Sequence, residues 1–358
     1  MSDIAIIKWA NNLGITESLN GSWIEAIARH YGEGGGEPHI RSIANNLGIT
    51  EPTNGSWIQA IGEHLGATAG TPWITQISNL TAGGSTSEFF EITVDTTKPG
   101  SASDTFVFAF GNTGTYNAVI DWGDGTTSDI TSYNDADRVH VYASSGTYQI
   151  KISGELPWIL FGGGSGVDRQ KVMSIDNWGI IPWRSFQYAF SGCINMDILA
   201  TDIPDLTTNS VSNISQIFRS CSSITSVSLV GWDTSNVTTM ALMFQSLTSC
   251  TSIDLTGIDT SNVTNFNQTF SNVPDDIVIG LDTWNIEKVT NFGNTFFNSA
   301  LSTVEYDKTL VAWDLQDARD GLNVQFGRSQ YTLNSAAATA KQSLMDNDLW
   351  TITDGGGI

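Results

Sequence analysis

The stretch Trp232-Asp-Thr-Ser-Asn-Val-Thr-Thr-Met-Ala-Leu-Met-Phe244 recurs along the chain at Ile258–Phe270 and at Trp284–Phe296. Equivalent Val and Phe positions are 26 residues apart, and a divergent copy precedes the three. A fixed period of this length is typical of a solenoid, in which each repeat buries its apolar side chains only against its neighbours. We therefore expect six repeat positions in the core: Val237, Phe244, Val263, Phe270, Val289 and Phe296.

Each copy also predicts local structure. The segment Val-Thr-x-x-x-x-x-Phe predicts a short helix, with its N-cap in the preceding Asp-Thr-Ser-Asn. The apolar stretches that follow, Ser226–Val230 and Ser252–Thr256, predict strands. A helix and a strand in about 26 residues are the geometry of a leucine-rich repeat. The motif resembles the BspA-like repeats of bacterial surface proteins, including those of mycoplasmas. The tail from Tyr306 to Gly356 is similar to the C-terminal cap of that family.

A different repeat occupies residues 1–68. Ala10-Asn-Asn-Leu-Gly-Ile-Thr-Glu17 recurs at 44–51, and Asn20-Gly-Ser-Trp-Ile24 recurs at 54–58. Each copy predicts two short helices, which are too small to be stable alone. Two interpretations stay open: an anchor that docks on another protein, or a self-contained four-helix domain. An anchor would make its contacts through apolar side chains, for which we select Trp23, Ile27, Trp57 and Ile61.

Residues 88–155 change to the short alternating apolar runs of strands, separated by Gly, Asn and Asp turns, which predicts a β-sandwich. Asp121-Trp-Gly-Asp-Gly-Thr126 and His140-Val-Tyr-Ala-Ser-Ser-Gly-Thr-Tyr148 resemble the polycystic-kidney-disease (PKD) type of immunoglobulin-like domain. This resemblance implies structural roles: a tight hairpin at Asp124-Gly125, Trp122 in the core, and a His-x-Tyr strand that pairs back.

Together these patterns predict a multidomain α+β chain. It comprises N-terminal short helical repeats, a PKD or immunoglobulin-like β-sandwich, and a C-terminal leucine-rich-repeat-like solenoid with a capping segment. The expected boundaries are 1–68 for the helical repeats, 69–87 for a linker, 88–155 for the sandwich, 156–185 for a junction, 186–305 for the solenoid and 306–358 for the cap.

Three tryptophans, Trp158, Trp178 and Trp183, fall in the expected junction. They could line a platform on which sugars stack, or they could fill the seam between the sandwich and the solenoid. Large aromatic side chains near domain junctions are more often part of the packing.

Charge limits the choice of partners. The chain has 358 residues and a net charge of −22, from 37 acidic and 15 basic residues. This balance disfavours nucleic acid and anionic membrane surfaces as partners. No apolar stretch is long enough to span a bilayer, and the N-terminus does not read as a signal peptide. The three cysteines, an odd number, are expected to be free buried thiols.

The chemistry-bearing motifs of common enzymes and cofactor sites are not found, so we expect neither catalysis nor a cofactor. One acidic cluster could supply oxygen ligands to Ca²⁺, at Asp121, Asp124 and Asp129. The cluster does not match the spacing of an EF-hand loop, and a turn explains Asp124-Gly125 equally well.

We therefore expect a non-enzymatic virion structural protein of a tailed bacteriophage, as a capsid decoration or a tail fibre or spike. The N-terminal repeats resemble those in structural proteins of marine phages. Residues 1–68 would bind other virion proteins, capsid or tail. The distal modules would bind a host-surface glycan or protein through variable polar positions between Trp232 and Phe296. The chain would be made in the host cytoplasm and carried on the virion surface. The alternatives are a BspA-like bacterial adhesin and a polysaccharide depolymerase.

Overall fold

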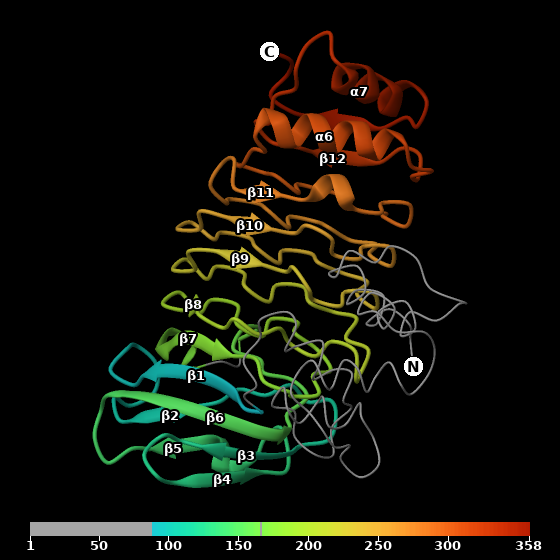
Figure 1. Ribbon diagram of the computed structural model, residues 1–358. Coiled ribbons are helices and arrows are strands. Elements are labelled where there is room, and N and C mark those ends of the chain that lie inside the picture. Colours follow the sequence, from blue (N-terminus) through green and yellow to red (C-terminus); the bar gives the residue numbers. More distant parts are fainter. Residues whose placement is uncertain (1–87, 165–166) are drawn as a thin grey trace, which may run out of the picture. The chain divides into compact units, whose positions relative to one another are not determined.

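The computed structural model describes residues 88–164 and 167–358 (Figure 1). The expected helical repeats, the linker and the four anchoring side chains, Trp23, Ile27, Trp57 and Ile61, lie outside the described residues. The described part combines several sheets with two α-helices, which confirms the α+β class at that coarse level.

The strands nearest the N-terminus of the described part form two sheets. One contains β1 (Phe90–Asp95), β3 (Asn117–Asp121), β4 (Thr127–Ile130) and β6 (Thr147–Glu155), with neighbouring strands antiparallel. The other pairs β2 (Thr105–Val107) with β5 (Val139–Val141), which is preceded by the 3-10 turn η1 (Ala136–Arg138). Alternate residues of β1 are buried because successive side chains of a strand point to opposite faces.

The structural roles expected for the residues around Trp122 are confirmed. Trp122 is fully buried, and β3 and β4 form the expected hairpin around Asp124-Gly125. His140 lies on β5, where its ring stacks on Trp122 with centroids 4.6 Å apart. The Tyr142 hydroxyl donates a hydrogen bond to the Trp122 carbonyl at 3.1 Å. The hairpin was expected, but its second strand was given no residues, because Thr127–Ile130 is polar at three of its four positions.

Residues 156–185 are more than a junction. After the 3-10 turn η2 (Arg169–Lys171), strand β7 (Val172–Asn177) pairs antiparallel with β1 and parallel with β8 (Asp197–Ile198). The result is one six-stranded sheet of order β4-β3-β6-β1-β7-β8, which runs from the hairpins into the first coil of the repeat region. One continuous set of buried apolar side chains extends from Phe90 to Trp350.

A buried ion pair stabilises the region around β7. Lys171 and Asp168 are both fully buried, with 3.7 Å between the ammonium nitrogen and a carboxylate oxygen. The Lys171 ammonium also donates to the carbonyls of Ala102 and Thr105 at 2.8 and 2.7 Å. The Asp168 carboxylate accepts from the Val107 N–H at 2.7 Å. These bonds tie the loop before β2 to the turn before β7, and they satisfy both buried charges.

The 26-residue repeats form stacked coils (Figure 1). On one side, β9 (Val227–Ser228), β10 (Ile253–Asp254) and β11 (Val278–Ile279) form a short parallel sheet. The strands predicted at Ser226–Val230 and Ser252–Thr256 are therefore confirmed, although each is only two residues long. Strand β11 is followed by the 3-10 turn η3 (Leu281–Thr283).

The helix predicted in each coil is wrong. The segment from Thr238 to Ser246 is a series of turns in which alternate N–H groups, from Met240 to Ser246, donate to the next coil. The N–H groups of Leu242 and Phe244, for example, donate to the carbonyls of Asn267 and Thr269 at 2.9 and 3.0 Å. Two residues in each such segment have a left-handed backbone at the 26-residue spacing. The first series is Gln216, Leu242, Gln268 and Asn294, and the second is Ser220, Ser246, Asn272 and Asn298.

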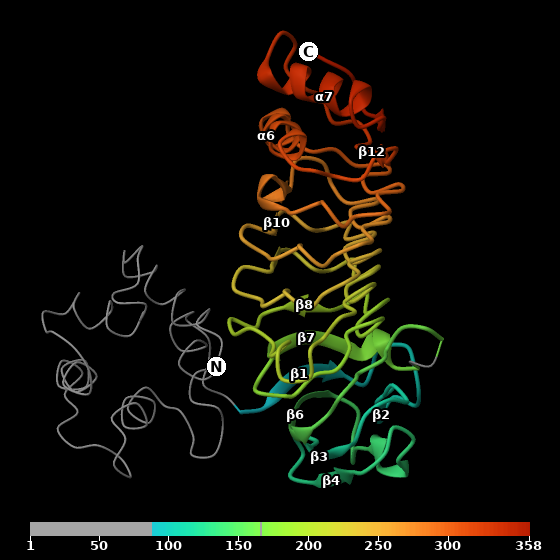
Figure 2. The ribbon, with the colours of Figure 1, turned by 90° about the vertical axis from the view of Figure 1, so that its right-hand side faces the viewer.

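The last coil is covered by residues 303–358. Helix α6 (Thr303–Asp314) begins at Ser302, whose side chain accepts from the Glu305 N–H, and α7 (Ala336–Asp346) begins at Ser335 in the same way. Strands β12 (Asn323–Gln325) and β13 (Thr351–Thr353) pair in parallel. Val324 of β12 forms a bridge with Phe292, so these strands continue the turn side of the stack, and α6 lies on the other side (Figure 2).

Candidate binding surface

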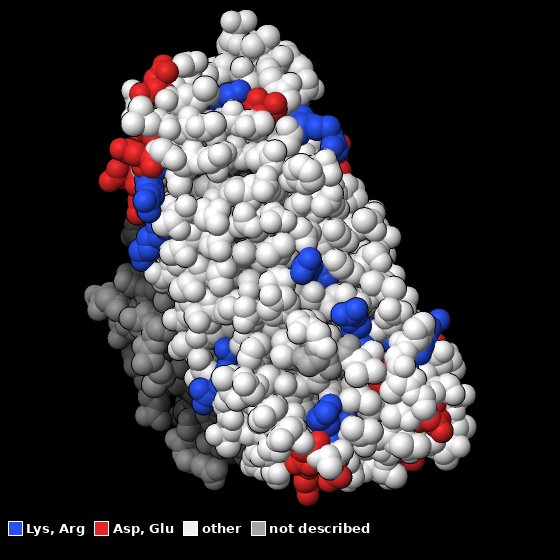
Figure 3. Space-filling view, turned by 180° about the vertical axis from the view of Figure 1, so that it is seen from behind, with Lys and Arg blue, Asp and Glu red and all other residues white. Residues whose placement is uncertain are grey.

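The turn side of the coils is the most uncharged surface of the stack. We call it the ladder face, and it comprises residues 212–220, 238–246, 264–272 and 290–298. These four segments contain a single charged residue, Arg219, in a chain of net charge −22. Figure 3 views the molecule from this side, and the coils there carry few acidic or basic side chains. A polar surface with almost no charge therefore covers the turn side of the repeats.

Hydroxyl groups align along one edge of the ladder face. The side chains of Thr238, Thr264 and Thr290 each donate to the carbonyl of the equivalent residue one coil earlier, at 3.1 Å. The same three residues repeat these contacts with their backbone N–H groups at 2.9 Å. Each threonine is exposed. The row is regular because the period of the sequence equals one coil.

Amide side chains form a second row, linked by hydrogen bonds. The Arg219 Nε donates to the Gln245 carbonyl oxygen at 2.7 Å, and the Gln245 amide donates to Gln268 at 2.8 Å. Gln268 donates to Asn267 at 3.1 Å, and Asn267 donates to the Gly293 carbonyl at 2.8 Å. The amide rotamers are thereby held in place, and their remaining donors and acceptors can bind a ligand.

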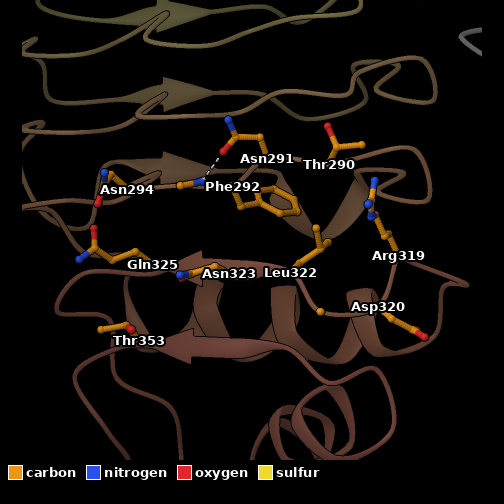
Figure 4. Close-up of a pocket in the computed structure, with 12 residues that line it drawn as sticks. Thr290, Asn291, Phe292, Asn294, Arg319, Asp320, Leu322, Asn323, Gln325 and Thr353 are labelled. Carbon is orange, nitrogen blue, oxygen red and sulfur yellow. Dashed lines mark hydrogen bonds between the residues drawn. The ribbon is translucent and has the colours of Figure 1, made fainter.

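The ladder face ends in a groove at the seam between the last coil and the cap (Figure 4). We call it the terminal groove, with a volume of about 580 Å³. Phe292 and Leu322 lie in its middle, Asn294 and Gln325 at one end, and Arg319 at the other. The complete lining is Thr290, Asn291, Phe292, Gly293, Asn294, Arg319, Asp320, Gly321, Leu322, Asn323, Gln325 and Thr353.

The composition of the terminal groove defines what it can bind. Amides and hydroxyls supply both donors and acceptors, and the apolar side chains of Phe292 and Leu322 are buried beneath them. The volume falls within the range of small-molecule pockets, about 300–1,000 Å³. The end with Arg319 also carries the Asp320 carboxylate, and burial together with this neighbouring charge raises the pKa of Asp348. The Gly321 N–H donates to the Asp348 carbonyl at 2.8 Å.

Only some of the residues that line this groove could be predicted from the sequence. Thr290, Asn291 and Asn294 belong to the polar repeat positions that were predicted to contact a host. Arg319 and Asn323 were not predicted. Arg319 lies in the loop after α6 and Asn323 on β12, and only the tertiary structure brings these two segments against the last coil. No spacing in the sequence links position 323 to position 291.

The six predicted repeat positions line the interior of the stack. Their exposed fractions are 0–1%, for Val237, Phe244, Val263, Phe270, Val289 and Phe296. The Phe side chains stack in a column: the ring centroids of Phe244 and Phe270 are 5.7 Å apart, and those of Phe270 and Phe296 are 4.8 Å apart.

The three aspartates weighed as a Ca²⁺ site are engaged separately. Asp121 accepts from the Gly123 N–H at 2.9 Å, which closes the hairpin turn. Asp124 accepts from the Thr126 N–H at 3.0 Å and contacts the His140 ring at 2.8 Å. Asp129 lies exposed on β4. Among the described residues, no group of three or more His, Cys, Asp or Glu side chains is placed to hold a metal ion.

The junction tryptophans serve packing. Trp178 and Trp183 are at most 1% exposed and contact Phe186 and Phe90 in the core. Trp158 is half-buried and donates from its indole N–H to the Gln187 carbonyl at 2.9 Å. A sugar platform built from these three side chains is therefore excluded.

The cysteines Cys193, Cys221 and Cys250 are free and buried, as expected. Burial raises the pKa of each thiol. The thiols are therefore protonated at neutral pH and unreactive.

Comparison with known proteins gives one match. A family model described as "Mycoplasma protein of unknown function, DUF285" matches residues 184–313, which span the coils and most of α6 but less than half of the chain. No curated protein and no solved structure matches the chain. Within the described residues, no helix is both long and apolar enough to cross a membrane. The repeat region is thus similar to a family whose function its description leaves open.

Proposed function

We propose that the protein is a non-enzymatic adhesion protein that binds a surface glycan along the ladder face and in the terminal groove. In this proposal residues 88–155 are a PKD-like sandwich, and the coils are a leucine-rich-repeat-type solenoid closed by its cap. The observation that carries the proposal is the terminal groove, in which six of the twelve lining residues carry an amide or a hydroxyl group. A sugar ring has the complementary chemistry, because the hydroxyls around its rim both donate and accept hydrogen bonds.

The ladder face supports the same function at lower affinity per contact. Its exposed hydroxyls and amides recur once per coil, as the sugars of a polysaccharide recur along a chain. Phe297 adds an exposed aromatic ring beside this surface, with 45% of the side chain accessible. Repeated weak contacts of one protein with one polymer raise the overall affinity through effective concentration.

The binding test uses the full-length protein on an array of neutral oligosaccharides such as glucans, mannans and galactans. We expect Asn323→Ala to weaken binding about five- to tenfold, because it removes an exposed amide of the groove that makes no hydrogen bond within the described residues. Gln342→Ala, an exposed amide on α7, is the matched control and should bind as wild type. The absence of binding to every glycan, or equal loss in both variants, would contradict the proposal.

The setting that we propose for this surface is the exterior of a tailed-phage particle, with residues 1–68 as the attachment to other virion proteins. Its support is the resemblance of the N-terminal repeats to those of marine phage proteins, which falls outside the described residues. Antibodies raised against residues 88–358 should label intact particles in electron micrographs. Labelling of host cells before infection, with unlabelled particles, would reject this setting.

A bacterial cell-surface adhesin is the second candidate, and a specific observation favours it. The family that matches residues 184–313 is described as a mycoplasma protein, which is a cellular rather than a viral source. The same antibody experiment separates the two settings, because an adhesin should label uninfected cells. Glycan binding by the groove is common to both candidates.

A further inference from the structure

A second pocket, at the opposite end of the ladder face, is formed by the first coil and a glycine-rich loop. We call it the arginine pocket, with a volume of about 460 Å³. Its lining contains two arginines, Arg169 and Arg219, and no acidic residue. This composition is unusual for a chain with 15 basic and 37 acidic residues. Tyr188, Ser191 and Ser220 supply further polar groups to the same lining.

Gly192 contacts the side chain of Arg169 and the backbone of Arg219. The Arg169 side chain lies directly on this glycine, because a Cβ added at Gly192 would be only 3.1 Å from its Cδ and 3.3 Å from its Nε. The Gly192 N–H donates to the Arg219 carbonyl at 2.8 Å. The Gly192 backbone is also left-handed, with φ of 80°, which is a second reason for glycine at this position. The absence of a side chain at this position therefore lets the guanidinium of Arg169 approach the first coil.

Neither positive charge is neutralised within the described part of the chain. The ion pairs found there involve other residues, and none includes Arg169 or Arg219. Arg219 donates from Nε to Gln245 at 2.7 Å and from one terminal nitrogen to Gln216 at 3.1 Å, and both acceptors are neutral amides. A guanidinium has five N–H donors, so three of those of Arg219 remain for a ligand.

We propose that the arginine pocket binds an oxyanion, a carboxylate or a sulfate, carried by an acidic polysaccharide whose uncharged part lies along the ladder face. A guanidinium fork matches the two oxygens of such a group. The hydrogen-bonded row Arg219–Gln245–Gln268–Asn267 leads from this pocket towards the terminal groove, so one extended polymer can contact both sites. This inference rests on the proposed glycan binding and adds a charge specificity to it.

The test measures binding of the full-length protein to three immobilised polymers: polygalacturonate for carboxylates, dextran sulfate for sulfates, and dextran as the neutral counterpart. We expect tighter binding to at least one acidic polymer than to dextran. Arg169→Gln and Arg219→Gln should each weaken that binding about tenfold to a hundredfold, since each removes charge-assisted hydrogen bonds. The polymer that responds identifies the oxyanion.

Controls separate the site from general electrostatics and from misfolding. Arg328→Gln removes one positive charge from the exposed Arg328–Asp275 pair and should leave acidic-polymer binding unchanged. Arg169→Lys and Arg219→Lys keep the charge but lose the fork, so binding should be intermediate while the melting temperature stays that of wild type. Equal binding to all three polymers, wild-type affinity in both Gln variants, or an equal loss in Arg328→Gln overturns the inference. If the protein binds neutral glycans but shows no preference for acidic polymers, only this inference is overturned. If it binds no neutral glycan of the array, the proposed function itself is contradicted.

Discussion

The central phenylalanine of the column, Phe270, provides the sharpest test of how the coils are stabilised. Its side chain is fully buried and stacks between Phe244 and Phe296, with centroid distances of 5.7 and 4.8 Å. Truncation of a buried Phe to Ala costs about 3–5 kcal/mol. Because Phe270→Ala also removes two ring contacts, we expect a loss in the upper part of that range, about 4–5 kcal/mol. This is a large share of the stability of a typical domain, about 5–15 kcal/mol.

The assay is urea unfolding followed by circular dichroism and tryptophan fluorescence. Phe297→Ala is the matched control, because it makes the same change in the following coil at a side chain that is 45% exposed. We expect the control to lose at most about 1 kcal/mol. Similar unfolding midpoints for the two variants would refute the reasoning that the column, rather than aromatic content, stabilises the stack. A changed dependence on urea concentration would show instead that the transition no longer involves the same surface.

Three further predictions concern buried polar groups. Lys171→Met leaves the Asp168 carboxylate buried without its cation and should cost about 3–5 kcal/mol, measured as a shift of the urea midpoint. Burial raises the pKa of Asp202 above its ordinary value of 3.8 despite hydrogen bonds from backbone donors that include Trp178 and Gly179, so the folded state holds this proton more tightly than the unfolded chain. The contribution of Asp202 to stability is therefore greatest below pH 3.8 and declines as pH rises through the folded pKa. The measurement is the unfolding free energy of wild type minus that of Asp202→Asn, from urea titrations at a series of pH values. This difference should fall as pH rises, and a difference that does not change with pH would contradict the prediction. Tyr306→Phe removes a buried hydroxyl that donates to Asp354 at 2.7 Å and should lower the free energy of unfolding by about 1–3 kcal/mol, whereas an unchanged thermal midpoint would show that the bond contributes nothing.

The wrong helix in each coil has a physical explanation. Val237, Met240, Phe244 and Leu247 are buried at spacings of three, four and three residues, which is also the spacing of one helix face. The periodicity therefore could not distinguish a helix from a turn series. In the stack, the left-handed backbone at positions such as Leu242 directs N–H groups towards the neighbouring coil. Left-handed residues cost about 1 kcal/mol or more each, and the hydrogen bonds between coils offset that cost.

The sheet that joins the hairpins to the first coil could not be predicted from the sequence either. Strand β7 was assigned to a junction because the neighbouring tryptophans and glycines interrupt its apolar run. Its partner β1 lies about 80 residues earlier, and pairing at that separation leaves no local pattern in the sequence.

The sequence alone determined the period of the stack, the side chains of its interior and the hairpin around Trp122. These are consequences of regular spacing and turn chemistry, which a single chain records locally. The tertiary structure alone decided where the ladder face begins and ends. Gly192 allows the Arg169 side chain to approach the first coil at one end, and strand β12 places Asn323 against the last coil at the other. Both pockets combine residues from separate elements, so their chemistry exists only once the backbone hydrogen bonds between coils have set the spacing.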